Sequence, residues 1–193
     1  TKDETQKITL LGFSSYYPVQ GGDMGSSFVE NTGTDADTVD MVQAFKAKGF
    51  SMNQTVADMY EALQPTFKSE VQSWGGTIEY NHITAPSTTG VFSSKEPSQA
   101  ALDGQNAAWK DSMNDNNVMI VTIARSASEN GTYQPGTAGV DPTQNLNQTD
   151  PLGLSDDERD LINAAVTAKA SNGGKVIVLL NNASAMEVQE IQD

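Results

Sequence analysis

The sequence predicts a doubly wound α/β fold, in which a mainly parallel sheet is sandwiched between two layers of helices. Two observations carry this prediction. The segments 118–124 and 176–180 are nearly continuous apolar runs, which is typical of strands that are buried on both faces. Segments with apolar residues at helical spacing alternate with the expected strands, and this alternation is typical of a parallel sheet that is covered on both sides.

The first half of the chain predicts one clear strand and two helices. The short apolar run at 8–13 is the first strand. Residues 38–48 carry apolar side chains at helical spacing, and Gly49-Phe50 is typical of a helix end closed by a hydrophobic contact. A further strand is weakly indicated at 50–56, and a second helix is predicted over 56–67. The apolar face of that second helix consists of Val56, Met59, Tyr60 and Leu63.

The second half has stronger signals. Ser155-Asp156-Asp157-Glu158 has the spacing of a capping box, and apolar residues follow it on one helical face. We therefore expect a helix that begins there and ends at Asn172-Gly173-Gly174. The run at 176–180 is expected to be a second buried strand, and residues 186–193 predict the start of another helix.

Two segments do not fit this alternation. Residues 69–97 mix Gly, Ser, Thr and Pro with short apolar stretches, which predicts an inserted hairpin or long loop. Residues 130–153 have almost no apolar pattern and predict a long exposed loop. Connections this long inside a compact domain are usually functional or disordered. The length of 193 residues favours a single domain over 1–193.

Composition excludes several classes of function. The chain has 11 Lys+Arg against 25 Asp+Glu and a formal net charge of −14, which argues against a nucleic-acid partner and against an anionic membrane surface. It has no cysteine and one histidine, so we expect no metal site, and we expect no cofactor. No apolar run approaches membrane-spanning length. An acidic, cysteine-free chain suits either side of a bacterial membrane, so the compartment stays open.

Candidate site residues follow the expected strands, because ligands of open α/β sheets bind beyond the carboxyl ends of the strands. The loop after the first strand contains Gly21 and Gly22, which let backbone N–H groups approach a ligand. Its spacing matches no phosphate-binding motif, so a flexible surface loop is the simpler interpretation.

Arg125 directly follows the apolar run at 118–124 and is one of two arginines in the chain. Its rigid donor fork could hold a hydroxylated or acidic ligand. Glu129, four residues later, could donate a proton if partial burial raised its pKa. A surface salt bridge at the base of a loop is the alternative interpretation of this pair.

In this order, these segments resemble the second, α/β-sandwich domain of glycoside hydrolase family 3. The run 7–12 is similar to the first strand of that domain, and the loop around Gly21-Gly22 to its glycine-rich turn. Val118 through Glu129 resembles a strand that runs into an R-x-S-G-E-G type loop. Residues 154–181 resemble the L-S-x-x-E helix followed by a V-x-V-L-x-N strand, and residues 69–97 match nothing in the family.

The resemblance implies a retaining β-glycosidase of which this chain is an excised part. A (β/α)8-type barrel in the same parent chain would carry the aspartate nucleophile, and this domain would close over a terminal β-linked sugar. The resemblance places Glu129 at the position of the family's general acid/base. The substrate-binding candidates that it implies are Arg125, Ser128, Asn130, Gly21 and Gly22. The family also has a later strand, so we expect the sheet to lack a terminal edge strand. With only half of the carboxyl pair, the chain by itself should be inactive.

The sequence departs from the family pattern beside the expected acid. Ser128 replaces a glycine, and Asn130-Gly131-Thr132-Tyr133 stands where the family has Gly-x-Asp-Arg. This departure favours an alternative in which the domain only shapes the substrate cleft without contributing to catalysis. A further alternative is a flavodoxin-like, nucleotide-binding module that uses the loop at 21–27, although the acidic net charge weighs against it. The sequence does not identify the sugar, the linkage or the oligomeric state.

Overall fold

Four parallel strands form the centre of the protein, in the order β2-β1-β6-β7. The structure is a computed structural model that describes residues 7–18, 39–67, 69–73, 76–80, 92–93, 96–126, 153–182 and 185–192. The parallel strands are β1 (Lys7–Leu11), β2 (Ser51–Met52), β6 (Val118–Ser126) and β7 (Lys175–Asn182). A short strand, β5 (Phe92–Ser93), pairs antiparallel with the end of β6.

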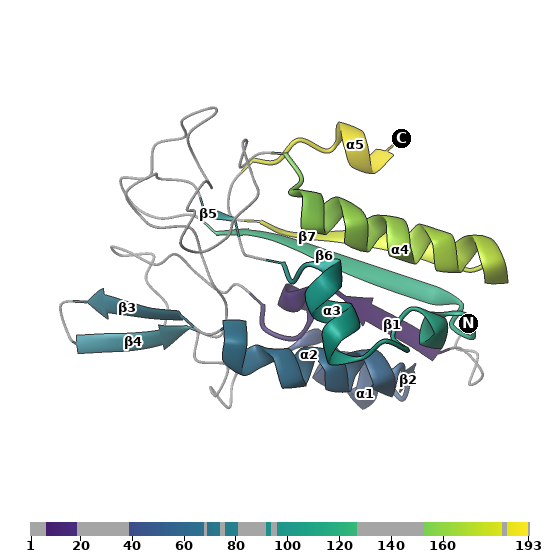
Figure 1. Cartoon of the computed structure of the whole chain (residues 1–193), viewed down its shortest axis with the longest axis horizontal. Coiled ribbons are helices and arrows are strands. Elements are labelled where there is room, and N and C mark those ends of the chain that lie inside the picture. The colour runs from purple at the N-terminus through teal and green to yellow at the C-terminus, as the bar shows by residue number, and fades with distance from the viewer. Residues whose placement is uncertain are drawn as a thin grey trace.

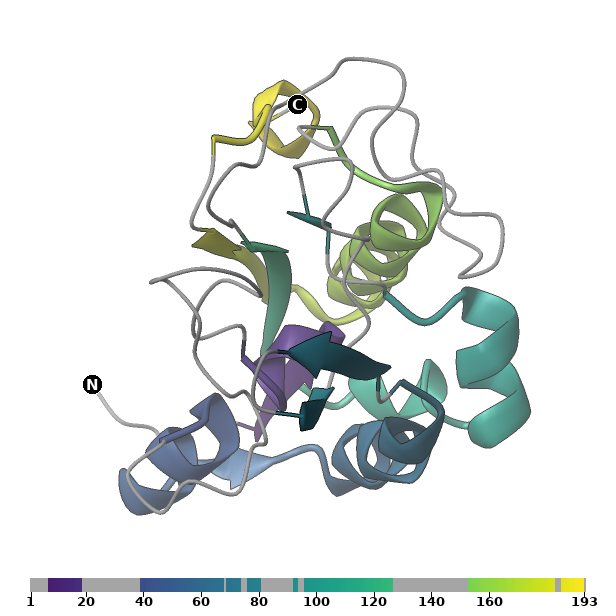
Figure 2. The same ribbon diagram turned by 90° about the vertical axis from the view of Figure 1, so that its left-hand side faces the viewer.

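Helices cover both faces of this sheet, and that arrangement confirms the predicted doubly wound, three-layer α/β fold (Figures 1 and 2). On one face lie α2 (Gln54–Phe67), α3 (Gln99–Gln105), the 3-10 turn η4 (Asp111–Met113) and α4 (Asp156–Asn172). The opposite face is covered by α1 (Met41–Ala47). The short α5 (Gln189–Gln192) ends the described chain near the start of α4.

The alternation of side chains along β6 explains why its sequence is continuously apolar. Met119, Val121 and Ile123 enter the larger core against α2, α3 and α4. Val118 and Ile120 point to the smaller core beneath α1, with Ile8 and Leu10 of β1. Because both faces are covered, apolar residues are favoured on either side of β6, and its buried Thr122 hydroxyl is hydrogen-bonded to Ser15.

The predicted helix ends are confirmed by their geometry. Ser155 and Glu158 form a complete capping box at the start of α4, and Gly173 ends that helix in the left-handed conformation with φ 70°. Asp40 caps α1, which begins three residues later than predicted. Gly49 has φ 74°, and the rings of Phe45 and Phe50 meet edge to face with centroids 5.5 Å apart. This is the hydrophobic contact that the sequence predicts after a glycine helix end.

The prediction that β7 is buried on both faces is wrong. Val176 and Val178 pack against the larger core, whereas Ile177 is 43% exposed and Leu179 is 39% exposed. In the described part of the chain, β7 pairs only with β6, and α1 covers the second face only over β1, β2 and β6. The expectation that the sheet lacks a terminal edge strand stays a prediction.

The irregular segments are described only in part. Two strands, β3 (Ser69–Ser73) and β4 (Gly76–Tyr80), pair as an antiparallel hairpin that is separate from the main sheet. Figure 1 places this hairpin beyond the carboxyl ends of the parallel strands. The predicted loop at 130–153 lies outside the described residues except for Gly153. The extent of the insertion and the single-domain boundary both stay predictions.

Candidate active-site edge

The carboxyl end of β1 turns sharply into the 3-10 turn η1 (Phe13–Ser15). Gly12 makes this turn with φ 89°, and a Cβ atom there would lie 2.2 Å from the Thr122 carbonyl oxygen. The Ser15 hydroxyl donates to the Leu11 carbonyl oxygen at 2.8 Å and lies 2.6 Å from the Thr122 hydroxyl of β6. The turn is therefore fixed against β6, and only glycine fits at position 12.

A buried carboxyl group, Glu96, holds the same turn from the other side. The Phe13 N–H donates to Glu96 Oε2 at 2.8 Å, and the Tyr60 hydroxyl donates to Oε1 at 3.0 Å. The Tyr60 oxygen in turn accepts from the Gly12 N–H at 2.9 Å. These bonds join the end of β1, helix α2 and the segment before α3, and they satisfy buried polar groups of all three.

Burial raises the pKa of Glu96 to about 8, because the ionised carboxylate is poorly stabilised away from water. The hydrogen bonds from Phe13 and Tyr60 lower it, and the charges of Glu158 and Asp157 raise it further. Burial also raises the pKa of Tyr60 well above its usual range, with Glu96 contributing in the same direction. A carboxyl group in this state holds a proton near neutral pH.

Arg125 lies at the carboxyl end of β6, and its side chain is completely buried. Its Nη1 donates to Glu158 Oε1 at 2.6 Å and its Nη2 donates to Glu158 Oε2 at 2.8 Å. Nη1 also donates to the Ala124 carbonyl oxygen and Nη2 to that of Gly153, both at 2.7 Å. Glu158 Oε2 accepts from the Ser155 N–H at 2.8 Å. The bidentate pair thus ties β6 to the first turn of α4.

Arg125 is the one predicted site residue that falls within the described part of the chain. Glu129, Ser128, Asn130, Gly21 and Gly22 all lie outside it, so their roles stay predictions. The structure shows Arg125 in a salt bridge that is buried, whereas the alternative interpretation expected a surface salt bridge. Its carboxylate partner among the described residues is Glu158; Glu129, the carboxylate that the sequence analysis pairs with it, lies outside the described residues. Substrate binding by Arg125 stays a prediction.

The sequence analysis does not identify Glu158 or Glu96 as members of this edge. Glu158 was assigned to the helix cap alone, and the same carboxylate also binds Arg125. Tyr60 was correctly placed on a buried helix face, where its hydroxyl needs a partner. The unpaired hydroxyl of a buried Tyr60 was the signal that could have led to Glu96. The sequence around Glu96, with Lys95 and Pro97 on either side, is typical of an exposed loop.

The end of β7 adds amide groups to this edge. Asn182 is the register partner of Arg125, and its Nδ2 lies 3.3 Å from the Met186 sulfur. The buried Asn182 Oδ1 accepts no hydrogen bond from the residues that the structure describes.

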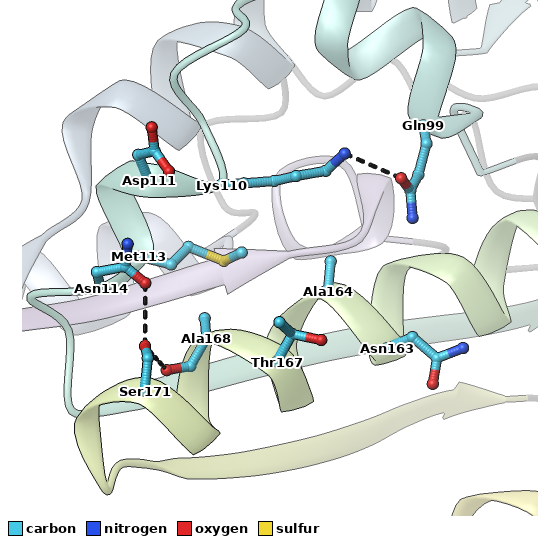
Figure 3. Close-up of a pocket in the computed structure, with 10 residues that line it drawn as sticks. All are labelled: Gln99, Lys110, Asp111, Met113, Asn114, Asn163, Ala164, Thr167, Ala168 and Ser171. Carbon is cyan, nitrogen blue, oxygen red and sulfur yellow. Dashed lines mark hydrogen bonds between the residues drawn. The ribbon is translucent and has the colours of Figure 1, made fainter.

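An open pocket of about 420 Å³ lies elsewhere, between η4 and α4 (Figure 3). The Lys110 amine on its rim donates to Gln99 Oε1 at 2.9 Å, and Ser171 lies 3.1 Å from Asn114 Oδ1. Asn172 at the end of α4 binds backbone carbonyls just before β6, so this pocket is nearer the amino ends of the strands. It is therefore separate from the edge formed by Glu96 and Arg125. Trp109, beside Lys110, packs in the core.

The described residues contain no group of three or more His, Asp or Glu side chains that could hold a metal ion. Among the same residues, no helix combines the length and apolar character needed to cross a membrane.

Comparison with solved structures identifies the architecture. Three structures of β-glucosidase 3B from Thermotoga neapolitana, in complex with α-D-glucose, glucose and glycerol, match the whole chain with TM-scores of 0.62, 0.62 and 0.61. The identities are 21%, 21% and 22%. The chain has the fold of part of a β-glucosidase. This finding agrees with the family resemblance of the sequence at the level of fold.

The chain spans 22% of the length of that β-glucosidase while being matched over its entire length. In fold, it therefore matches a segment of the larger enzyme. No family model matches the chain, and no curated protein matches it either.

Proposed function

We propose that this chain is the second domain of a family 3 retaining β-glycosidase, which closes the active site over a terminal β-linked sugar. In this proposal, Glu129 is the general acid/base and a (β/α)8-type barrel in the same parent chain carries the nucleophile. The observation that carries the proposal is the end of β6. The strand delivers the chain to the carboxyl edge at Arg125, four residues before Glu129, in a fold matched to a β-glucosidase over its whole length.

The chemistry requires a second carboxyl group from outside this chain. Retention of configuration uses a nucleophile and a protonated acid whose carboxyl groups lie about 5–5.5 Å apart. A domain that supplies the acid alone lacks the nucleophile, so we expect the isolated chain to hydrolyse aryl β-glycosides at no more than the uncatalysed rate. Turnover of the isolated chain comparable with an ordinary glycosidase would rule out the two-domain arrangement.

The test uses Glu129→Ala in the full-length parent enzyme, with aryl β-glycosides of good and poor leaving groups. An acid/base role predicts a loss of about 10²–10⁴-fold for the poor leaving group, because that step needs protonation. The rate with the good leaving group should fall only slightly, because that group leaves without protonation. Azide should restore turnover by forming a glycosyl azide.

The control is Asp156→Asn, which removes an exposed carboxylate at the same end of the sheet. It should retain full activity with both substrates. If Glu129→Ala also reacts normally with both, Glu129 is a loop carboxylate and the domain shapes the cleft without taking part in the chemistry.

A further inference from the structure

We propose that the pocket between η4 and α4 is a second, non-catalytic sugar-binding site, which takes a neutral pyranose such as glucose (Figure 3). Its volume of about 420 Å³ lies within the range of about 300–1,000 Å³ that small-molecule sites occupy. The inference goes beyond the proposed function and does not depend on it, because it uses only groups that lie away from the carboxyl edge of the sheet.

Two hydrogen-bonded bridges close the η4–α4 pocket at its ends. At one end, the Gln99 amide of α3 donates to the Asp160 carbonyl oxygen of α4 at 3.2 Å. At the opposite end, the Ser171 hydroxyl of α4 lies 3.1 Å from Asn114 Oδ1, directly after η4 (Figure 3). The bridges hold α4 at a fixed distance from α3 and η4, so the space between these elements is preformed, as it is in most small-molecule sites.

The floor of the pocket is apolar. Met113 and Ala168 are buried, and Ala164 is partly buried beside them. Ala164 and Ala168 lie one helical turn apart on the same face of α4, and their methyl groups leave the space in front of Met113 open. One face of a pyranose ring carries only C–H groups, and such a face can pack against small apolar side chains.

Polar side chains surround this floor and can form further hydrogen bonds. Asn163, Thr167 and Ser171 follow one another at intervals of four residues, so they form a row along one side of α4. Within the described part of the chain, the side chains of Asn163 and Thr167 have no hydrogen-bond partner. Amide and hydroxyl groups both donate and accept, and this combination matches the hydroxyl groups of a sugar.

The charges around the pocket favour a neutral ligand over an anion. Lys110 is the one cation among the described residues that line it, and Asp103 already binds the Lys110 amine at 3.1 Å. The same amine donates to Gln99 at 2.9 Å and lies 5.3 Å from the centre of the Trp109 ring. Asp111 adds a negative charge to the rim. A phosphate would therefore meet a neutralised lysine and an opposing carboxylate, whereas a sugar hydroxyl can donate to Asp111.

The experiment titrates the 193-residue chain with D-glucose and follows its assigned backbone amide signals by NMR. We expect saturable shifts at Asn114, Asn163 and Thr167, with a Kd of about 1–10 mM for so small a ligand. The signal of Arg125, at the carboxyl edge, should change little. Inorganic phosphate is the probe for an anion site, and it should cause no saturable shift of the pocket signals.

Ala164→Leu tests the location of the site, because the larger side chain occupies the floor of the pocket. We expect the affinity for glucose to fall by about 10-fold or more. Ala170→Leu is the matched control, since it makes the same substitution at an exposed position of α4 outside the pocket, and it should keep the affinity. If Ala164→Leu does not fold, Asn163→Ala replaces it. That variant removes an exposed amide and should weaken binding about 3–10-fold.

Four results would overturn the inference. The absence of a saturable shift up to about 100 mM glucose would exclude a sugar site of this strength. Shifts that centre on Arg125 would place the sugar at the carboxyl edge instead. Phosphate binding as tight as glucose binding would make the pocket an anion site. An affinity that Ala164→Leu and Asn163→Ala leave unchanged would exclude the pocket as the site. The titration does not measure hydrolysis, so its outcome is independent of the test of Glu129.

Discussion

Glu96 and Glu158 are buried carboxyl groups at the same edge of the sheet, yet they are accommodated in different ways. They are 7% and 2% exposed, and the charge of Glu158 contributes to the raised pKa of Glu96. Glu158 faces a guanidinium with two short hydrogen bonds. The hydrogen-bond donors of Glu96 in the described chain, the Phe13 N–H and the Tyr60 hydroxyl, are both neutral.

The difference shows what each carboxyl group can do. A carboxylate that is paired with arginine keeps its charge and holds two elements in a fixed orientation. A buried carboxyl with only neutral donors takes up a proton instead, so its effect on the fold depends on pH. The following substitutions test this contrast, beginning with the largest expected effect.

Arg125→Met should destabilise the protein most, by about 3–5 kcal/mol, because it leaves the Glu158 charge buried without a partner. The double substitution Arg125→Met/Glu158→Gln should recover much of this loss, since no buried charge is left. Urea unfolding of the two variants measures the difference. A single variant no less stable than the double variant would contradict the view that the pair compensates a buried charge.

Glu96 should make stability depend on pH. Its pKa in the folded protein, about 8, lies above the ordinary value of 4.5 that we take for the unfolded chain. The folded state therefore binds more protons, and stability falls as pH rises between these values. From pH 5 to pH 8, Glu96 alone should lower the free energy of unfolding by on the order of 3 kcal/mol.

Glu96→Gln isolates this contribution, because the amide resembles the protonated acid in shape and charge. The variant should lose the fall in stability between pH 5 and pH 8, measured by urea unfolding across that range. Glu61→Gln, on the exposed side of α2, is the control and should keep the pH dependence of the unsubstituted protein. Parallel pH profiles for all three proteins would show that Glu96 is ionised in the fold.

Gly12→Ala tests the turn that Glu96 holds. A Cβ atom would approach the Thr122 carbonyl oxygen to 2.2 Å, and alanine disfavours the φ of 89°. We expect a loss of about 2 kcal/mol or more in thermal or chemical unfolding. Gly104→Ala in α3 is the matched control, since nothing lies within 4 Å of the added atom. That change should stabilise the helix by up to about 1 kcal/mol.

The smallest effect is expected on the exposed side of α4. Arg159 binds Glu190 with its Nε at 2.6 Å and Asp156 with Nη1 at 2.8 Å, as short as the bonds of Arg125. Solvent screens these charges, so Arg159→Gln should change the urea midpoint only within experimental error. A large loss of stability in Arg159→Gln would show that the length of an ion pair, rather than its burial, determines how much it stabilises this protein.

The fold could be predicted because its signals are local. The apolar run of β6 and the capping box at Ser155 each lie within a few residues of sequence, and both are present in the structure. The short α3 was missed, since its seven residues carry little apolar pattern. The open face of β7 was also missed, because an apolar run does not reveal which neighbours cover it.

The candidate site was less predictable because its contacts are long-range. Arg125 was singled out from its place after a buried strand, but its partner Glu158 lies 33 residues away. Glu96 meets Phe13 across 83 residues and Tyr60 across 36. Only the assembled sheet brings these groups together, so the local sequence around Glu96 gives no indication of its burial.

The open face of β7 has a consequence for handling the chain by itself. Ile177 and Leu179 are exposed on β7, next to a strand edge that is unpaired among the described residues. Unpaired strand edges can pair with another copy of the chain. A net charge of −14 opposes that association through mutual repulsion. In 1 M salt, the distance over which surface charges repel each other falls to about 3 Å. Added salt should therefore drive the chain to self-associate, a colloidal response that light scattering at rising ionic strength would follow directly.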